Sequence, residues 1–375
     1  MTNLRAGRVV FLSYHVLDSP RRAGFHWLAD AFWAARWDVT FVTTGISLAS
    51  RLRGDPRFAS GQPIGVPTEL APRLAMYIEP AFIHPAQLTA PWLRDAAAIP
   101  MARYGRRLSD TLVAYLRAAD LVVFESNASL MMFDAVRRAT DAKLVYRVSD
   151  DVRVIRNSPL VRAAEDAAIH QFDCVSVPSR ALLQSRFANV KRAVYQPHGV
   201  PDLPAASGKQ RYGSNGPNAT SVGSTLLDYE FLRVAPLRRP AITFHQVGQM
   251  NAPVRAPNLV AHGELPYADA IDFAAQAELC LALYEEHPHS IYLAETSNKL
   301  ALFMALRKRI VAPEFLRGHL DRPGIFFYDV KNRPTIDAAL DAALAFDPAD
   351  VPFVSHSSWA DVRDRLLESV GMIKP

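Results

Sequence analysis

Short apolar runs of strand length alternate with amphipathic stretches in the first two hundred residues. The expected strands cover residues 9–14, 39–44, 74–78, 121–125, 143–148, 174–178 and 193–197. Between them, apolar positions recur with helical spacing over residues 25–36, 103–118, 129–138 and 161–172. Strands that alternate with helices in this way indicate an α/β domain with a doubly wound parallel sheet.

A second alternating series begins after a turn-rich stretch. Residues 204–217 (PAASGKQRYGSNGP) are poor in apolar side chains, and we expect them to form the linker between two domains or a long loop after it. Strands are then expected at residues 220–226, 242–247 and 259–262, with helices at 229–235 and 269–277. The final segment, residues 358–370, predicts a helix with one apolar face. We therefore expect an N-terminal domain over residues 1–200, a C-terminal domain over 201–356, and a terminal helix within 357–375 that packs back on the N-terminal domain.

Residues 279–313 predict a strand, a polar loop, a helix and another strand. The helix begins at an N-cap, Thr296 or Ser297, and Arg307, Lys308 and Arg309 are expected in its last turn. Lys299 falls in the first turn, where acidic residues are usually preferred. A bound phosphate would explain this exception, since a helix N-terminus at the edge of a parallel sheet favours anions. A solvated lysine on a surface helix is the alternative.

Composition excludes several classes of protein. The chain of 375 residues is half hydrophobic and 21% charged, which is typical of a globular protein of two domains. No apolar run reaches the roughly 18 residues that a membrane span needs, and the apolar start at residues 9–16 is too short for a signal peptide, so a cytoplasmic location is expected. Cys174 and Cys280 lie in apolar runs, which predicts buried thiols and no disulfide.

Positive charge is concentrated in the first half of the chain. Residues 1–200 carry 25 Lys and Arg against 17 Asp and Glu, a balance of +8, and the remaining 17 against 20 leave −3. A basic domain can face nucleic acid, an anionic membrane or a phosphorylated substrate. No nucleic-acid-binding motif accompanies the charge, so no nucleic-acid partner is expected. No G-x-G-x-x-G follows an expected strand, which disfavours a nicotinamide dehydrogenase.

Five short motifs stand in order along nearly the whole chain. They are the segment 15–45 (HVLDSPRRAGFHWLADAFWAARWDVTFVTTG), YRVSDD at 146–151, QPHGV at 196–200, HGELPY at 262–267, and the spacing from Tyr284 to Lys299. Together they resemble the inverting glucuronosyltransferases of glycosyltransferase family 70, typified by the enzyme that adds glucuronic acid during xanthan assembly. The resemblance implies a GT-B fold and transfer of glucuronic acid from UDP-glucuronate to a sugar on a polyprenyl diphosphate at the inner face of the cell membrane, in exopolysaccharide biosynthesis. No cofactor is expected beyond the UDP-sugar.

Asp150 and Asp151 follow the expected strand 143–148, at the sheet edge where α/β folds bind ligands. An inverting transfer needs a carboxylate that accepts the proton of the acceptor hydroxyl. The resemblance implies that this base is an aspartate of the segment, and Asp150 matches better. Either residue could instead cap the following turn, Asp151 more readily than Asp150. Side chains of neighbouring residues diverge and no D-x-D motif is present, so no metal is expected.

For the donor, the resemblance implies Glu264 at the ribose or base, Tyr284 against the nucleotide, and Asn298 and Lys299 at the diphosphate. Gly223 and Ser224 offer close backbone approach, and Ser297 begins the helix. A solvated loop acid and a half-buried tyrosine are the alternatives for Glu264 and Tyr284. Many retaining GT-B enzymes carry a glutamate four residues after the lysine, where Phe303 stands in this chain, and this favours inversion. The family often has methionine in place of Asn298. Arg147, Arg153 and Lys299 are candidates to bind the donor carboxylate.

Two segments combine aromatic and basic residues, as surfaces in the lipid headgroup layer do. In residues 25–37 the packing of a helix explains the aromatics almost as well. Residues 91–108 are the better candidate for membrane or lipid-diphosphate contact, through Trp92, Arg94, Arg103, Arg106 and Arg107.

Four histidines lie at positions where they could take part in chemistry. His287 and His289 flank Pro288 without a third ligand nearby and are expected to be loop residues. His15 ends the first strand, and His26 begins the first helix. Histidines at such positions are often core or capping residues.

Two other functions remain open from the sequence. A nucleotide-sugar 2-epimerase has the same GT-B architecture, although it would not need a basic, aromatic N-terminal half. A non-catalytic subunit that binds a sugar nucleotide or a polysaccharide is the second. The acceptor sugar, its linkage, and glucuronate against glucose in the donor also stay open.

Overall fold

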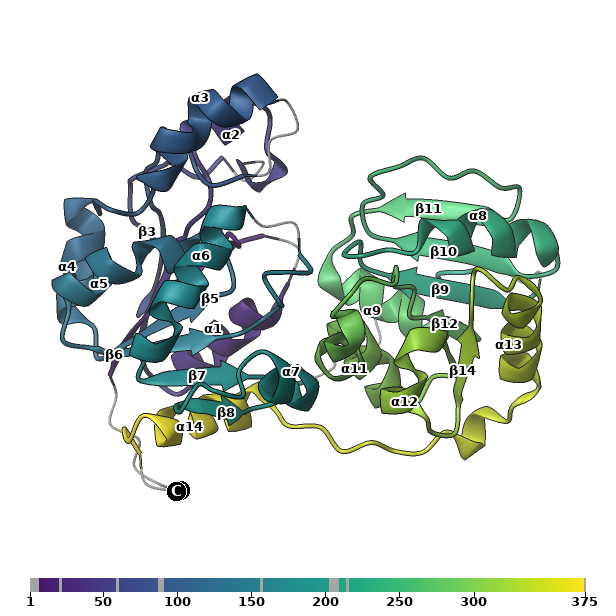
Figure 1. Cartoon of the computed structure of the whole chain (residues 1–375). Helices are drawn as coiled ribbons and strands as arrows, with labels where there is room; N and C mark the ends of the chain where they lie inside the picture. The colour runs from purple at the N-terminus through teal and green to yellow at the C-terminus, as the bar shows by residue number, and fades with distance from the viewer. Residues whose placement is uncertain are drawn as a thin grey trace. The chain divides into compact units, whose positions relative to one another are not determined.

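The computed structural model describes residues 7–19, 22–58, 61–86, 91–155, 158–201, 209–213 and 216–373 (Figure 1). The chain divides into two compact units, Met1–Gly199 with Trp359–Pro375, and Val200–Ser358. Each unit is a parallel sheet covered by helices, which confirms the predicted fold class. Among the described residues, no helix has both the length and the apolar character needed to cross a membrane.

The N-terminal unit is built on an eight-stranded sheet in the order β3-β4-β2-β1-β5-β6-β7-β8. Its strands are β1 (Arg8–Ser13), β2 (Asp38–Thr43), β3 (Thr68–Ala71), β4 (Leu74–Ile78), β5 (Leu121–Glu125), β6 (Lys143–Arg147), β7 (Cys174–Val177) and β8 (Ala193–Tyr195). Only β3 runs antiparallel to its neighbour. Every strand expected in this half is present, and β3 is an additional edge strand that the sequence did not indicate.

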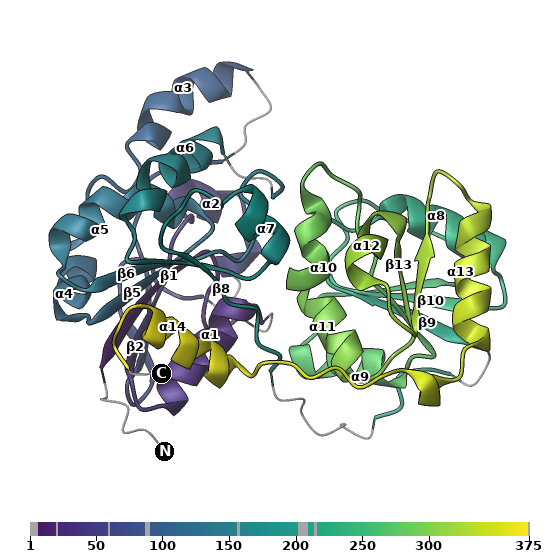
Figure 2. The same ribbon diagram turned by 60° about the horizontal axis from the view of Figure 1, so that its bottom comes forward.

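Helices cover both faces of this sheet (Figure 2). They are α1 (Gly24–Ala34), α2 (Leu48–Leu52), α3 (Pro91–Ala102), α4 (Asp110–Ala118), α5 (Phe133–Ala139), α6 (Pro159–Ala168), α7 (Arg180–Ser185) and α14 (Trp359–Ser369). On one face, α1 and α14 pack together over Phe11 and Phe41, and Arg363 of α14 donates a hydrogen bond of 2.8 Å to the carbonyl of Ala31. The aromatic residues of 25–37 are thus largely core residues, since Phe25, Phe32 and Trp37 are buried.

The expected helix at 103–118 was wrong in its first half. The structure ends α3 at Ala102 and begins α4 at Asp110. Gly105 has φ of +73°, which a side chain would strain, and a Cβ there would lie 2.6 Å from the Met132 side chain. Ser109 then caps α4 by accepting a hydrogen bond from the Leu112 amide. The glycine and the cap therefore exclude residues 103–109 from α4, and α3 is a helix that the sequence analysis did not predict.

The C-terminal unit contains a parallel six-stranded sheet in the order β11-β10-β9-β12-β13-β14. Its strands are β9 (Asn218–Val222), β10 (Thr243–Val247), β11 (Leu259–Gly263), β12 (Leu279–Leu281), β13 (Ile310–Pro313) and β14 (Ile325–Tyr328). Its helices are α8 (Tyr229–Arg238), α9 (Tyr267–Gln276), α10 (Leu293–Thr296), α11 (Asn298–Ala305), α12 (Arg317–Leu320) and α13 (Pro334–Ala345). Half of the expected linker, residues 204–208, 214 and 215, lies outside the described residues. Arg211 and Tyr212, which lie within that stretch, contact α9 through Asp272 and Phe273.

The sequence predicted Arg307, Lys308 and Arg309 in the last turn of α11. This was wrong, because the helix ends at Ala305. Lys308 donates a hydrogen bond of 2.9 Å to the carbonyl of Ala275, near the end of α9. Arg309 donates to the carbonyls of Leu344 and Phe346, at the end of α13. These cations thus satisfy the C-terminal carbonyl groups of neighbouring helices, where positive charge is favoured.

The two cysteines are buried and free, as expected. Burial raises the pKa of the Cys280 thiol to about 12 and also raises that of Cys174. We therefore expect neither thiol to react with a disulfide reagent in the native protein, and both to react after unfolding.

Candidate active site

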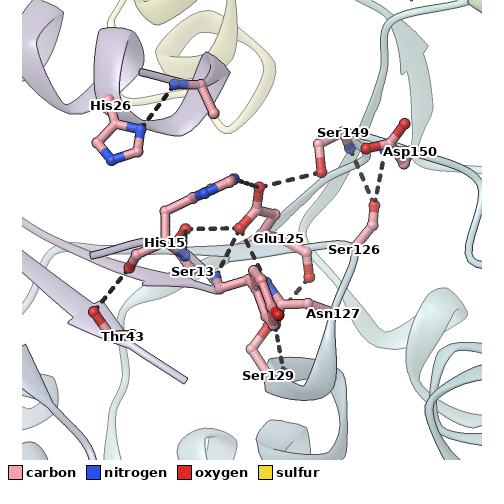
Figure 3. Close-up of polar contacts among 12 residues, drawn as sticks. Ser13, His15, His26, Thr43, Glu125, Ser126, Asn127, Ser129, Ser149 and Asp150 are labelled. Atoms are coloured by element: carbon pink, nitrogen blue, oxygen red, sulfur yellow. Dashed lines mark hydrogen bonds and ion pairs between the residues drawn. The ribbon is translucent and has the colours of Figure 1, made fainter. Parts of the chain in front are cut away.

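The carboxyl ends of three adjacent strands bring polar residues together in the N-terminal unit (Figure 3). The segments are residues 13–15 after β1, 125–127 at the end of β5, and 149–150 after β6. Asp150, the expected base, is half-buried at this edge. This is the position at which parallel α/β sheets bind their ligands.

The backbone before Asp150 is held by Ser126. The Ser126 Oγ accepts hydrogen bonds from the amides of Ser149 (3.0 Å) and Asp150 (3.5 Å), and lies 3.1 Å from the hydroxyl oxygen of buried Tyr146. Tyr146 in turn donates a hydrogen bond of 2.6 Å to Glu165 of α6. Asp150 is therefore attached to a chain of buried hydrogen bonds, which fixes the main chain from which its carboxylate extends.

Asp151 has a different environment from Asp150. Its buried carboxylate accepts hydrogen bonds from the amide and the Nε of Arg153, both at 2.9 Å, and its carbonyl accepts from the amide of Val154. These bonds close a turn and form an ion pair. Asp151 thus caps the following turn, which was the alternative given for it from the sequence.

The two arginine candidates for the donor carboxylate are engaged within their own unit. Arg147 is buried, and its guanidinium donates to Ser176 (2.7 Å), to the Gln196 carbonyl (2.6 Å) and toward His198 Nδ1 (2.9 Å). Burial lowers the pKa of Arg147 to about 9. Arg153 pairs with Asp151. Lys299, the third candidate, belongs to the C-terminal unit and forms none of these contacts.

Glu125 is the central residue at this edge, and sequence reasoning did not select it. Its buried Oε2 accepts hydrogen bonds from Ser13 Oγ (2.7 Å), the Tyr14 amide (2.9 Å) and Asn127 Nδ2 (3.0 Å). Ser149 Oγ lies 3.4 Å from Oε1. Burial raises the pKa of this carboxyl group. The sequence feature that could have identified Glu125 is a carboxylate at the end of an otherwise apolar strand, LVVFE.

His26 is a capping residue and is kept neutral. Its Nδ1 accepts a hydrogen bond of 2.9 Å from the Ala23 amide at the start of α1, so the proton resides on Nε2, which donates to the Val16 carbonyl at 3.0 Å. Burial, with a smaller contribution from His15, lowers the pKa of His26 to about 3. One of the two sequence candidates is thus structural.

In the C-terminal unit, Ser297 is the N-cap of α11 and accepts a hydrogen bond of 3.0 Å from the Leu300 amide. Its hydroxyl also bonds to the hydroxyl of Tyr284. The Lys299 Nζ lies 4.3 Å from the centroid of the Tyr284 ring and 3.4 Å from the Leu283 carbonyl. Burial lowers the pKa of Lys299 to about 7. These contacts join Tyr284, Ser297 and Lys299 at the start of one helix.

Tyr284 is buried, with 4% of its surface exposed. Tyr284 is therefore more buried than the half-buried tyrosine considered as the alternative. Stacking of its ring on uracil stays a prediction. Asn298 and Glu264 are exposed, and Ser224 is half-buried. Their roles in donor binding also stay predictions.

Two glycine loops lie close to Lys299. Gly223, after β9, has φ of +91°, and a Cβ there would lie 3.9 Å from the Lys299 Cε. Gly248, after β10, has φ of +123°, and a Cβ there would lie 3.1 Å from the Gly223 backbone. Both positions require glycine. The β9 loop thereby brings its main chain next to the lysine. Close approach of the Gly223 backbone to the donor stays a prediction.

Among the residues that the structure describes, no three His, Cys, Asp or Glu side chains are grouped as metal ligands. His287 and His289 lie in an exposed loop, as expected. Transfer without a metal stays a prediction.

The segment expected to contact lipid forms α3 and the turn after it. Trp92 and Ile99 are 70% and 66% exposed, and Arg103, Arg106 and Arg107 are exposed as well. The Arg94 side chain lies outside the described part of the chain. Phe82 and Leu52, which are 85% and 90% exposed, lie on segments joined by a hydrogen bond from the Leu48 amide to the Ala81 carbonyl. Exposed apolar side chains therefore accompany exposed arginines in this region.

Comparison with known proteins finds a family match in the N-terminal unit and a relative over nearly the whole chain. Residues 11–178 match the family described as "Glucuronosyltransferase GumK, N-terminal domain". The chain is 27% identical over 370 residues to the UDP-glucuronate:glycolipid 2-beta-glucuronosyltransferase of Xanthomonas campestris pv. campestris, covering 98% of this chain and 91% of that one. The resemblance to the family 70 glucuronosyltransferases is thus confirmed.

Solved structures show the fold. A sucrose-phosphate synthase from Thermosynechococcus elongatus is similar with a TM-score of 0.65 and 14% identity, over 97% of this chain and 96% of that one. An alpha,alpha-trehalose-phosphate synthase (UDP-forming) from Burkholderia xenovorans gives a TM-score of 0.61 and 13% identity, over 97% and 100%. The protein is therefore a glycosyltransferase of GT-B fold, and residues 11–178 of its N-terminal unit match the GumK N-terminal domain family.

Proposed function

We propose that the protein transfers glucuronic acid from UDP-glucuronate to a saccharide carried on a polyprenyl diphosphate, with inversion at the anomeric carbon, during exopolysaccharide synthesis. The observation that carries the proposal is the similarity over 98% of the chain to an enzyme named for UDP-glucuronate and a glycolipid acceptor. The position of Asp150 at the carboxyl edge of the N-terminal sheet supports it.

In the proposed reaction, the acceptor binds to the N-terminal unit and Asp150 is the general base. The acceptor O–H bond breaks as its oxygen attacks the anomeric carbon, and the proton passes to the Asp150 carboxylate. The bond from the anomeric carbon to the diphosphate breaks, and UDP leaves. The rigid backbone at Asp150, fixed through Ser126, limits the motion of the base.

The donor diphosphate is proposed to bind to the C-terminal unit at the start of α11. There the Lys299 ammonium and the backbone amides of the first helical turn can stabilise the negative charge that develops on the leaving UDP. The backbone at Gly223 lies beside the lysine and can approach the phosphates closely. This arrangement would supply the stabilisation without a metal ion.

The direct test mixes the protein with UDP-glucuronate and a lipid-linked saccharide, and measures both released UDP and the glycolipid by mass spectrometry. We expect UDP release only with acceptor present, together with a glycolipid heavier by one glucuronyl residue. UDP-glucose and UDP-galacturonate serve as donor controls. Conversion of the UDP-sugar to its C2 epimer, separated by chromatography, with neither net UDP release nor a new glycolipid, would point to a 2-epimerase, and binding without turnover to a non-catalytic subunit.

We also propose that the protein is peripheral to the inner face of the cell membrane and contacts it through α3 and the following arginines. Trp92 and Ile99 can enter the interface while Arg103, Arg106 and Arg107 pair with anionic headgroups. This contact would place the N-terminal unit next to a lipid-linked acceptor.

The protein is expected to sediment with anionic vesicles and to be released as salt rises, because charge pairing with lipid is screened. Trp92→Ser, and replacement of the three arginines by glutamine, should each weaken binding severalfold. Phe353→Ser is the matched control, since Phe353 is 75% exposed but belongs to the C-terminal unit. Equal binding of wild type and these variants, or equal binding to neutral and anionic vesicles at every salt concentration, would contradict the proposed surface.

A further inference from the structure

A buried glutamine of the C-terminal unit lies beneath the turn that follows β9. Gln246 of β10 is fully buried, and its Nε2 donates hydrogen bonds to the carbonyls of Gly223 (2.8 Å) and Val247 (3.2 Å). Two carbonyl acceptors at one end of the amide assign the NH2 group to that end. The Gln246 side chain therefore ties the turn after β9 to the end of the neighbouring strand β10 (Figure 1).

The other end of this amide has no such contact. The Gln246 Oε1 is buried and has no hydrogen-bond partner in the described part of the chain. Gln246 follows Phe244 by two residues, so both side chains lie on the face of the sheet that the apolar core covers. An apolar side chain of similar size would avoid the cost of an unpaired buried oxygen. What glutamine adds at this position is therefore the pair of Nε2 contacts.

Gly223 is held through both of its backbone polar groups. Its amide donates a hydrogen bond of 2.8 Å to the Val247 carbonyl, and its carbonyl accepts from Gln246. Its φ of +91° favours glycine, and a glycine allows the peptide that follows it to face in either direction. The hydrogen bond from Gln246 therefore selects one of the two orientations.

The selected orientation decides where the next N–H group points. In a trans peptide, the C=O of one residue and the N–H of the next point in opposite directions. Since the Gly223 carbonyl faces the buried amide of Gln246, the Ser224 N–H faces away from the core. This N–H has no hydrogen-bond partner among the residues that the structure describes. The turn lies beside Lys299, because a Cβ on Gly223 would be 3.9 Å from the lysine Cε.

We propose that the Ser224 N–H donates a hydrogen bond to the diphosphate of the nucleotide sugar, and that Gln246 is the positioning residue that orients this peptide. The inference rests on the proposed donor site at Lys299, and it names a backbone donor of that site and the buried side chain behind it. An N–H that faces the diphosphate attracts its oxygens, whereas the opposite peptide orientation would present a carbonyl and repel them. The ammonium and the N–H would then bind one anion together.

The test compares the binding of UDP and of uridine, measured by calorimetry and by NMR titration, in wild type and in Gln246→Met. Methionine keeps the length of the side chain and removes its donor. We expect UDP to bind about tenfold more weakly to the variant, the scale of one charge-assisted hydrogen bond. Uridine should bind as it does to wild type, because it has no phosphate. A general disturbance of the unit would weaken the binding of both ligands.

Ser221→Ala is the matched control. Ser221 pairs directly with Gln246 across β9 and β10, and it is also fully buried. Its Oγ has no hydrogen-bond partner in the part of the chain that the structure describes. Loss of this hydroxyl leaves the contacts of Gly223 in place, so both ligands should bind as they do to wild type.

A second measurement uses the wild type alone. The amide proton resonance of Ser224 should move downfield with UDP and stay in place with uridine, because a hydrogen bond to phosphate deshields the proton. An unmoved resonance with UDP would overturn the inference, and this result decides the matter if Gln246→Met does not fold. Equal UDP binding by wild type and Gln246→Met, or an equal loss of UDP and uridine binding, would also overturn it.

Failure of the proposed function looks different from failure of this inference. A wild type that binds UDP with the expected shift of the Ser224 amide, yet forms no glycolipid, would support the role of Gln246 and contradict the transfer reaction. A wild type that binds no UDP would overturn the proposed donor site and this inference with it.

Discussion

Replacing Asp150 by asparagine is expected to lower kcat for transfer by roughly 10² or more, the usual range for loss of a general base. Asparagine keeps the size of the side chain but does not accept the proton of the acceptor hydroxyl. The backbone bonds from residues 149 and 150 to Ser126 do not involve the carboxylate and should persist. UDP affinity, measured by calorimetry, and the melting temperature should hardly change, because the donor is proposed to bind to the other unit.

Asp151→Asn is the matched control, one residue away. Its carboxylate is ion-paired with Arg153 in a closed turn, so the variant should lose about 1 kcal/mol of stability and retain most of its turnover. Near-normal transfer by Asp150→Asn at saturating substrates would show that the base is another residue. An inactive Asp151→Asn with an active Asp150→Asn would exchange the two assignments.

Lys299→Ala is expected to weaken binding of UDP and UDP-glucuronate by about 1.5 to 3 kcal/mol, the scale of a lost charge-assisted contact. The reason is the position of the ammonium at the N-terminus of α11, beside the Gly223 backbone. Lys331→Ala is the control in the same unit, since Lys331 forms an exposed ion pair with Glu286. UDP affinity that is equal in the two variants would move the diphosphate to another place.

The same lysine should make UDP binding dependent on pH. Burial lowers the pKa of Lys299 to about 7 in the free protein, and a bound diphosphate would favour the ammonium and raise that pKa. The dissociation constant should therefore be nearly constant below pH 7 and rise above it, by up to about tenfold per pH unit, until the pKa of the complex is reached. Lys299→Ala should remove this rise. A wild-type dissociation constant that does not change between pH 7 and 9 would show that Lys299 does not titrate with binding.

The strands of both units could be predicted because each buried strand is a short apolar run bounded by turns. Edge strand β3 escaped this criterion, since Glu69 and Leu70 point into solvent and the strand has no continuous apolar face. The start of α4 was placed too early because helical periodicity from residue 103 outweighed Gly105, which has a positive φ and lies against Met132. Local patterns thus indicated the elements, and tertiary contacts set their limits.

The candidate site was predictable where position along a strand decides it. Asp150 and Lys299 could be selected as candidates because a strand end and a helix start are visible in sequence. Glu125 was not selected, because its importance depends on donors from residues 13, 14 and 149, which only the strand order brings together. The lowered pKa of Lys299 likewise results from burial beneath the β9 loop and Tyr284, which sequence spacing does not measure.

The return of α14 to the first sheet has a consequence for synthesis on the ribosome. The helix contributes Val362, Leu366 and Leu367 to the core around α1, yet it is translated after the whole C-terminal unit. The C-terminal unit, residues 200–358, is complete in sequence before this helix emerges. During translation of the C-terminal unit, the apolar surface that α14 covers in the N-terminal unit is therefore exposed. The N-terminal unit completes its folding after the unit that follows it has been translated.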